Sequence, residues 1–243
     1  MVTQGTLYLS LFVATFAVSW AAVLIKMTGA GPLPTAFYRM GFAALIIAVP
    51  ALPKVRKTIR HLSSKEIWLL MTSGIVLGLH FATWVTSLFF TTISNSTILV
   101  ATQPMWVLIM EALILKQKIP ARSAVGMALA LVGMIVISRG DFDLGDEYIL
   151  GDALALMGAV CAATYLFIGR QLRANLDNLD YVFPVYAISA LTLLLISLLQ
   201  GENLVDYPVK TWLLFLLRPS TRSSIIWQCT MLSILHTISG WAL

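Results

Sequence analysis

Residues 7–25 read LYLSLFVATFAVSWAAVLI and contain no charged residue. A helix needs about 20 apolar residues, each rising ~1.5 Å, to cross a hydrocarbon core of about 30 Å. The stretch therefore predicts a membrane-spanning helix. A cleaved signal peptide would open with basic residues, whereas the first charged residue here, Lys26, follows the apolar run. We expect this helix to remain in the mature protein.

Stretches of the same kind recur along the chain of 243 residues. Further spans are predicted at residues 35–52, 67–90, 93–115, 123–138, 150–168 and 181–199. An eighth begins at Thr211, and residues 223–243 are apolar enough for a ninth. The runs are continuous and not alternating, which excludes a β-barrel, and a helix pairs each backbone N–H within its own segment. The predicted fold class is all-α: a polytopic helical membrane protein, here with about eight or nine helices.

The composition supports the same class. Hydrophobic residues make up 59% of the chain and charged residues 11%, against about 25% charged in a soluble domain, and the mean hydropathy is +0.88. An ordinary soluble enzyme is therefore excluded. Cys161 and Cys229 lie in apolar runs without a CxxC pair, so we expect neither a disulfide framework nor a metal site. No cofactor or nucleic-acid partner is expected.

Positive charge alternates from one predicted connection to the next. Lys and Arg accumulate in cytoplasmic loops, and 12 of the 16 basic residues fall in alternate connections. These are Lys54, Arg56, Lys57, Arg60, Lys65, Lys116, Lys118, Arg122, Arg170, Arg173, Arg218 and Arg222. The opposite connections carry Asp141, Asp143, Asp146, Glu147, Asp152, Glu202 and Asp206. The pattern predicts a multi-pass protein of the plasma (cytoplasmic) membrane with a cytoplasmic N-terminus.

Two segments resemble each other. Residues 11–27 and 156–172 are both rich in small residues, continue with aromatic residues and close on a base, Lys26 or Arg170. Because five spans precede the second copy, that copy enters the membrane from the other side. An inverted repeat is a common plan of membrane transporters.

Several motifs resemble the EamA-type permeases of the drug/metabolite transporter superfamily. GDALAL at residues 151–156 and the run 162–170 are similar to the opening of that family's second repeat, and residues 78–115 and 125–137 to its third, fourth and fifth spans. The resemblance covers residues 6–217. It implies ten helices in a five-plus-five inverted repeat that moves small metabolites. We therefore expect a first repeat at 6–138 and an incomplete second repeat at 149–217.

The chain departs from the family pattern at two places. Lys116-Gln117 replace a common Gly-Glu pair at the end of span four, so no role is transferred from that Glu. After Leu217 the sequence RPSTRSSIIWQCTMLSILHTISGWAL is rich in Ser and Thr. We interpret residues 218–243 as an aberrant tail, out of frame or truncated; the alternative is a genuine, divergent ninth helix.

Polar groups inside a span are costly and by default face a cavity. Glu111 is the only acid that falls within the core of a predicted span. It is a candidate for proton coupling or for a substrate cation, and the alternative is a side chain that reaches the interface near Lys116 and Lys118. His80 and Trp84 share a face of span three. Together they could line a cavity, with His80 as a second proton-coupling candidate, or His80 could bond a neighbouring helix.

Other candidates for substrate binding lie in spans one, two, four and six. Arg39 could hold a substrate carboxylate, or anchor to lipid headgroups with Tyr38 in the aromatic belt. Gln103-Pro104 breaks span four, and Gln103 offers a polar contact or a helix–helix hydrogen bond. Trp20 and Tyr165 could wall a pocket or simply pack. Small residues in spans five and six, Gly126, Gly133 and Gly158 among them, indicate close helix packing.

These observations predict a secondary transporter and not an enzyme. No P-loop, GxSxG or HExxH motif is present. The resemblance implies a small-molecule substrate such as an amino acid, a drug or a related solute, moved by alternating access, with export as the common direction. The alternatives are a non-functional transporter remnant or a non-transporting membrane partner protein. Substrate identity, ion coupling and oligomeric state stay open.

Overall fold

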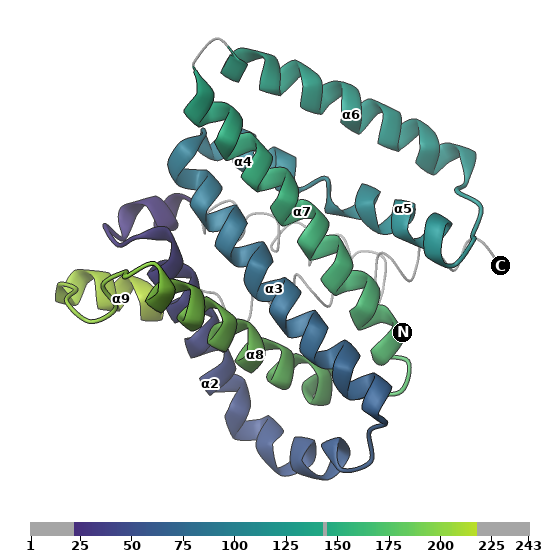
Figure 1. Cartoon of the computed structure of the whole chain (residues 1–243), viewed down its shortest axis with the longest axis vertical. Helices are drawn as coiled ribbons and strands as arrows, with labels where there is room; N and C mark the ends of the chain where they lie inside the picture. Colours follow the sequence, from purple (N-terminus) through teal and green to yellow (C-terminus); the bar gives the residue numbers. More distant parts are fainter. Residues whose placement is uncertain (1–21, 143–144, 218–243) are drawn as a thin grey trace, which may run out of the picture.

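The computed structural model describes residues 22–142 and 145–217 of the chain (Figure 1). Residues 22–27 are helical, and eight further helices follow. They are α2 (Pro32–Ile59), α3 (Ser64–Phe90), α4 (Ile93–Val100), α5 (Gln103–Ile114), α6 (Ala121–Phe142), α7 (Asp146–Leu172), α8 (Asn178–Leu199) and α9 (Val209–Leu217). The described residues contain no strand, so the all-α prediction is confirmed.

Each described span coincides with a predicted apolar run, and α2, α3, α6, α7 and α8 extend beyond theirs. Five are long and apolar enough to cross a membrane among the described residues, counting α4 and α5 as one. The apolar part of α6, Ala121–Val136, is shorter, as predicted for span five. Helices extend past the apolar runs because polar residues can continue a helix once it has formed. The first span is described only from residue 22, and the tail from residue 218 lies outside the described residues.

Local sequence signals explain where several helices begin. Ser63 and Glu66 form a capping box at the start of α3, in which each side chain accepts a hydrogen bond from the other residue's backbone N–H. Pro32 and Pro104 occupy the first turns of α2 and α5, where the missing N–H costs nothing. The break between α4 and α5 lies at residues 101–102. The predicted break of span four at Gln103-Pro104 is thereby confirmed.

Successive spans run in opposite directions, with α4 and α5 together forming one span, so the bundle has two ends. We call the end with connections 60–63, 115–120 and 173–177 the basic end, and the end with connections 28–31, 91–92 and 200–208 the acidic end. At the basic end Thr58 Oγ1 donates to Asp180 Oδ2 over 2.8 Å. At the acidic end Thr91 Oγ1 donates to Asp152 Oδ1 over 2.9 Å. The alternation that the charge pattern predicts is present, while the membrane side of each end stays a prediction.

Four helices, α2, α3, α7 and α8, form the centre of the bundle (Figure 1). Glycines allow α3 to approach α8 closely, since a Cβ at Gly74 would lie 2.6 Å from Ile188 Cβ and one at Gly78 2.9 Å from Thr192 Cβ. On the other side of α3, a Cβ at Gly158 of α7 would lie 3.3 Å from Trp84 Cβ. Small residues are what let membrane helices pack at this distance.

Helix α6 stands apart from this centre and packs mainly on α7 (Figure 1). A Cβ added at Gly126 or Gly133 would have no described atom within 4 Å. The close packing predicted from small residues is therefore found in α7 and absent from α6 within the described part of the chain. Sequence alone could not separate the two cases, because a small residue facing lipid and one facing a helix look the same.

Candidate functional site

Arg39 is the centre of the candidate site. It lies two turns into α2 from the acidic end and is 7% exposed. Its guanidinium carbon lies 5.0 Å from the ring centroid of Phe81 and 5.6 Å from that of Trp84, both on α3. It also interacts electrostatically with Tyr186 of α8. The cation therefore rests on two aromatic faces inside the bundle.

The guanidinium has no acidic partner among the described residues. Its Nη1 is buried without a hydrogen bond, and the ion pairs found join other residues. Residues 1–21 and 218–243 contain no Asp or Glu. The acids whose side chains the structure does not describe are Asp141 and Asp143. A buried cation without a counter-charge is costly in a membrane span, and this cost is the physical reason to treat Arg39 as a candidate site residue.

His80 links this site to α7. Its Nδ1 lies 2.8 Å from the carbonyl oxygen of Gly158. Because a carbonyl can only accept, Nδ1 carries the proton, and Nε2 is the nitrogen left to exchange a proton or accept one. The imidazole stacks on Trp84 with ring centroids 5.9 Å apart and an interplanar angle of 11°. His80 thus joins α3 to α7 and forms one wall of the Arg39 site.

We call Arg39, His80, Phe81 and Trp84 the Arg39 site. Sequence reasoning selects three of these and misses Phe81, and it also misses Tyr186. Phe81 directly follows His80 and lies three residues before Trp84, so helical spacing is the available signal. Trp84 Nε1 is buried without a hydrogen bond. The site therefore holds two unsatisfied donors, on Arg39 and on Trp84.

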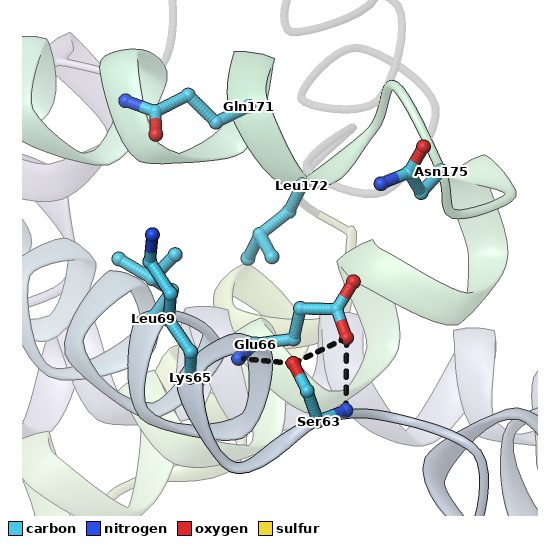
Figure 2. A pocket seen from close by; sticks show the side chains of 7 residues that line it. All are labelled: Ser63, Lys65, Glu66, Leu69, Gln171, Leu172 and Asn175. Carbon is cyan, nitrogen blue, oxygen red and sulfur yellow. Dashed lines mark hydrogen bonds between the residues drawn. The ribbon is translucent and has the colours of Figure 1, made fainter.

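The Arg39 site is closed in this structure, because all four side chains are less than 9% exposed. A separate cavity of about 290 Å³ opens at the basic end, between the start of α3 and the end of α7 (Figure 2). Five of its seven lining residues are polar: Ser63, Lys65, Glu66, Gln171 and Asn175. Residues of α3 and α7 contribute both to this cavity and to the surroundings of the Arg39 site.

Tyr38 lies away from the Arg39 site, although it is adjacent in sequence. Consecutive helical residues point about 100° apart, and Tyr38 faces α9. Its hydroxyl donates to the Leu204 carbonyl, and its ring stacks on Phe215 with centroids 4.9 Å apart. Tyr38 therefore ties α2 to α9 and to the connection after α8.

Glu111 forms an ion pair with Arg170 of α7 near the basic end. Its side chain is 8% exposed and that of Arg170 is 33% exposed. Neither Lys116 nor Lys118 pairs with it among the described ion pairs. The carboxylate is held by a charge from the second predicted repeat, so the pair connects α5 to α7.

The structure does not bring the other candidates to the Arg39 site. Tyr165 stacks on Tyr181, with centroids 6.1 Å apart, and lies two turns, ~10 Å, beyond Gly158 toward the basic end. Gln103 is 4% exposed at the first turn of α5, whereas the ring contacts of Arg39 are with Phe81 and Trp84 of α3. Trp20 lies outside the described residues.

Two further acids are buried near helix starts. Asp152 of α7 and Asp180 of α8 are each 7% exposed. Hydropathy places both in or near connections because they precede or border the apolar runs. Each is held by a threonine of a neighbouring helix, Thr91 or Thr58. Asp152 falls at the start of the predicted run 150–168, and Asp180 directly precedes the run 181–199.

The unpaired charge predicts an unusual stability effect. We expect Arg39→Met to raise the apparent melting temperature in detergent by about 4–8 °C, corresponding to ~2 kcal/mol. Methionine fills similar volume and removes the cost of burying the cation, which exceeds the two ring contacts. Differential scanning fluorimetry of purified protein measures the change. Arg56→Met, at an exposed position of the same helix, is the control, and a fall for Arg39→Met would contradict the argument.

A helical bundle with several helices that are long and apolar enough to span a membrane defines a polytopic helical membrane protein. Residues 3–139 match the EamA-like transporter family. The match covers more than half of the chain, which therefore belongs to this family.

Relatives with curated names point the same way. The chain is 24% identical over 191 residues to the uncharacterized transporter YyaM of Bacillus subtilis, covering 74% of this chain and 61% of the relative. It is 25% identical over 206 residues to the pseudopaline exporter CntI of Pseudomonas aeruginosa, covering 84% of this chain and 69% of the exporter. The chain thus spans about three fifths of the length of the Bacillus relative. A crystal structure 20% identical aligns with a TM-score of 0.64 over 93% of this chain and 79% of that one, which shows a shared fold.

Proposed function

We propose that this protein is a secondary transporter that moves small organic metabolites by alternating access, with export as its direction. The observation that carries the proposal is the Arg39 site, a closed polar site with unused hydrogen-bond donors at the junction of four helices. Intramembrane polar groups with unsatisfied capacity mark solute pathways. Membership of the EamA-like family and a relative named as an exporter support the same function.

The arrangement of helices suggests how the site would open. Helices α2 and α3 belong to the first predicted repeat, and α7 and α8 to the second. Arg39, Phe81 and Trp84 come from the first, while Gly158 and Tyr186 come from the second. Rocking of one repeat against the other would expose the site first at one end and then at the other.

Proton coupling is part of the proposal through His80 and Glu111. Glu111 is engaged by Arg170, so protonating it would leave a cation without its partner. His80 has one ring nitrogen free of hydrogen bonds to described residues and lies in the site itself, so it is the stronger candidate. A His80→Ala variant that transports with an unchanged pH profile would remove His80 from this role.

Two tryptophans of α3 give a matched test of the site. Trp84 is 3% exposed and Trp68 is 69% exposed. We expect Trp84→Ala to lower transport by about tenfold or more, because it removes a wall and a donor of the site, and Trp68→Ala to leave transport near wild type. The measurement is counterflow of labelled metabolites in proteoliposomes containing the 243-residue chain.

The same assay separates the proposal from its alternative. Equal transport by both tryptophan variants would place the solute pathway elsewhere. A chain that inserts and folds but exchanges no metabolite in the panel would instead be a non-transporting membrane protein, either a remnant or a partner of another protein.

A further inference from the structure

We propose that the Arg39 site takes a small organic anion, specifically a monocarboxylate with an aromatic or aliphatic body and no ammonium group. The proposal rests on the proposed function for the location of the site and deepens it by naming the substrate class. Two observations carry it. The Arg39 cation has no counter-charge among the described residues, and two hydrogen-bond donors at the site are buried without an acceptor.

The charge balance requires an anion. The Arg39 guanidinium is 7% exposed, and its Nη1 has no hydrogen-bond partner. A charge removed from water is compensated only by an opposite charge with good geometry. Since no described carboxylate pairs with it, the missing partner is supplied by the ligand. Closing of the site around an anion neutralises the charge, whereas closing around a cation would double it.

The donor balance favours a carboxylate. A guanidinium that rests on ring faces keeps its N–H groups in its own plane, where the two oxygens of a carboxylate accept them together. Trp84 Nε1 is a second buried donor without an acceptor. The two polar atoms of the site that are fully buried without a hydrogen bond, Arg39 Nη1 and Trp84 Nε1, are both donors, and a carboxylate only accepts.

The same balance excludes an amino acid. A bound ammonium needs a carboxylate or several carbonyl acceptors. The described acids inside the bundle are each engaged elsewhere: Glu111 by Arg170, Asp152 by Thr91 and Asp180 by Thr58. Around Arg39 the walls are the rings of Phe81, Trp84 and His80. His80 Nε2 can accept one hydrogen bond, fewer than the three that an ammonium donates, and the other two rings suit an apolar body. A zwitterion would leave its cation beside Arg39 without a counter-charge.

Four probes with one phenyl ring test this in the purified 243-residue chain. Phenylacetate carries an anion, phenylacetamide is neutral, phenethylamine is a cation and phenylalanine is a zwitterion; hexanoate adds an aliphatic carboxylate. Binding is measured by isothermal titration calorimetry in detergent, which does not depend on transport. We expect phenylacetate and hexanoate to bind and the other three to bind about 30-fold more weakly or not at all.

Variants connect binding to the site. Arg39→Met should weaken phenylacetate binding by about 30-fold or more while the protein stays folded with a raised melting temperature. Arg39→Lys keeps the charge without the planar fork and should be intermediate. Arg56→Met is the matched control, with unchanged binding. Equal binding of phenylalanine or phenethylamine, absence of carboxylate binding, or carboxylate binding unaffected by Arg39→Met overturns the inference.

The outcome is separable from that of the proposed function. Carboxylate binding that depends on Arg39, without any transport in proteoliposomes, would overturn the transporter and leave this inference standing. Transport of phenethylamine or phenylacetamide that does not depend on Arg39 would overturn this inference and leave the transporter standing.

Discussion

Arg170→Gln should lower the stability of this protein by about 3 kcal/mol, whereas Glu111→Gln should lower it by only ~1 kcal/mol. The two residues form one ion pair between α7 and α5, but they are not equally buried. The Glu111 side chain is 8% exposed and that of Arg170 is 33% exposed. Removing Arg170 leaves a carboxylate buried without a partner, while removing Glu111 leaves a cation that reaches water.

A double-mutant cycle measures this asymmetry. The double variant Glu111→Gln with Arg170→Gln leaves no charge unpaired, so it should be more stable than Arg170→Gln alone. Thermal melts in detergent should show a loss of about 6–12 °C for Arg170→Gln and recovery of most of it in the double variant. Lys54 and Asp177, an exposed pair 3.9 Å apart at the same end, provide the control, because such pairs contribute ~0–1 kcal/mol. Additive effects of the two single changes would contradict the pairing.

The ion pair also shows where sequence reasoning ends. Both residues are visible in the sequence as charges near the ends of predicted spans. However, proximity along the chain associates Glu111 with Lys116 and Lys118, and its actual partner is 59 residues away. Which helix meets which is decided by packing between distant segments. That information is absent from a hydropathy pattern.

The spans themselves are predictable, because a hydrocarbon core imposes a length and an apolar composition on each segment. The ends of the spans are less predictable from the sequence. Asp152 borders an apolar run, and its charge places it with a connection, but α7 begins at Asp146. A polar residue can remain helical when a neighbouring helix satisfies it, as Thr91 does here. Apolar composition therefore locates a span within a turn or two and leaves its ends to tertiary contacts.

For Arg39 the sequence leaves two environments open, a solute site and a headgroup anchor. Position along α2 is compatible with both, since the residue lies near the acidic end. What places it between Phe81 and Trp84 is the rotation of α2 relative to α3 and α8. We infer that this rotation depends on how closely α3 and α8 approach, and Gly74 and Gly78 of α3 are the residues that allow that approach.

Those two glycines should therefore be among the least tolerant positions of the chain. A Cβ at Gly74 would lie 2.6 Å from Ile188 Cβ, and one at Gly78 would lie 2.9 Å from Thr192 Cβ and 3.1 Å from the Ser189 carbonyl oxygen. A leucine at either position would force α3 and α8 apart, at a cost of ~3 kcal/mol or more. We expect Gly78→Leu to abolish recovery of folded protein in fluorescence-detected size-exclusion chromatography.

Glycines of α6 supply the matched control, since a Cβ at Gly126 or Gly133 would have no described atom within 4 Å. Gly126→Leu should be recovered as wild type. The corresponding alanine variants should change stability in opposite directions. Gly78→Ala destabilises the protein through its contacts with α8, whereas Gly126→Ala stabilises it by up to ~1 kcal/mol through helix propensity alone. Equal losses for the two leucine variants would mean that α6 packs as tightly as α3. In that case the α3–α8 contact would not be what sets the position of Arg39.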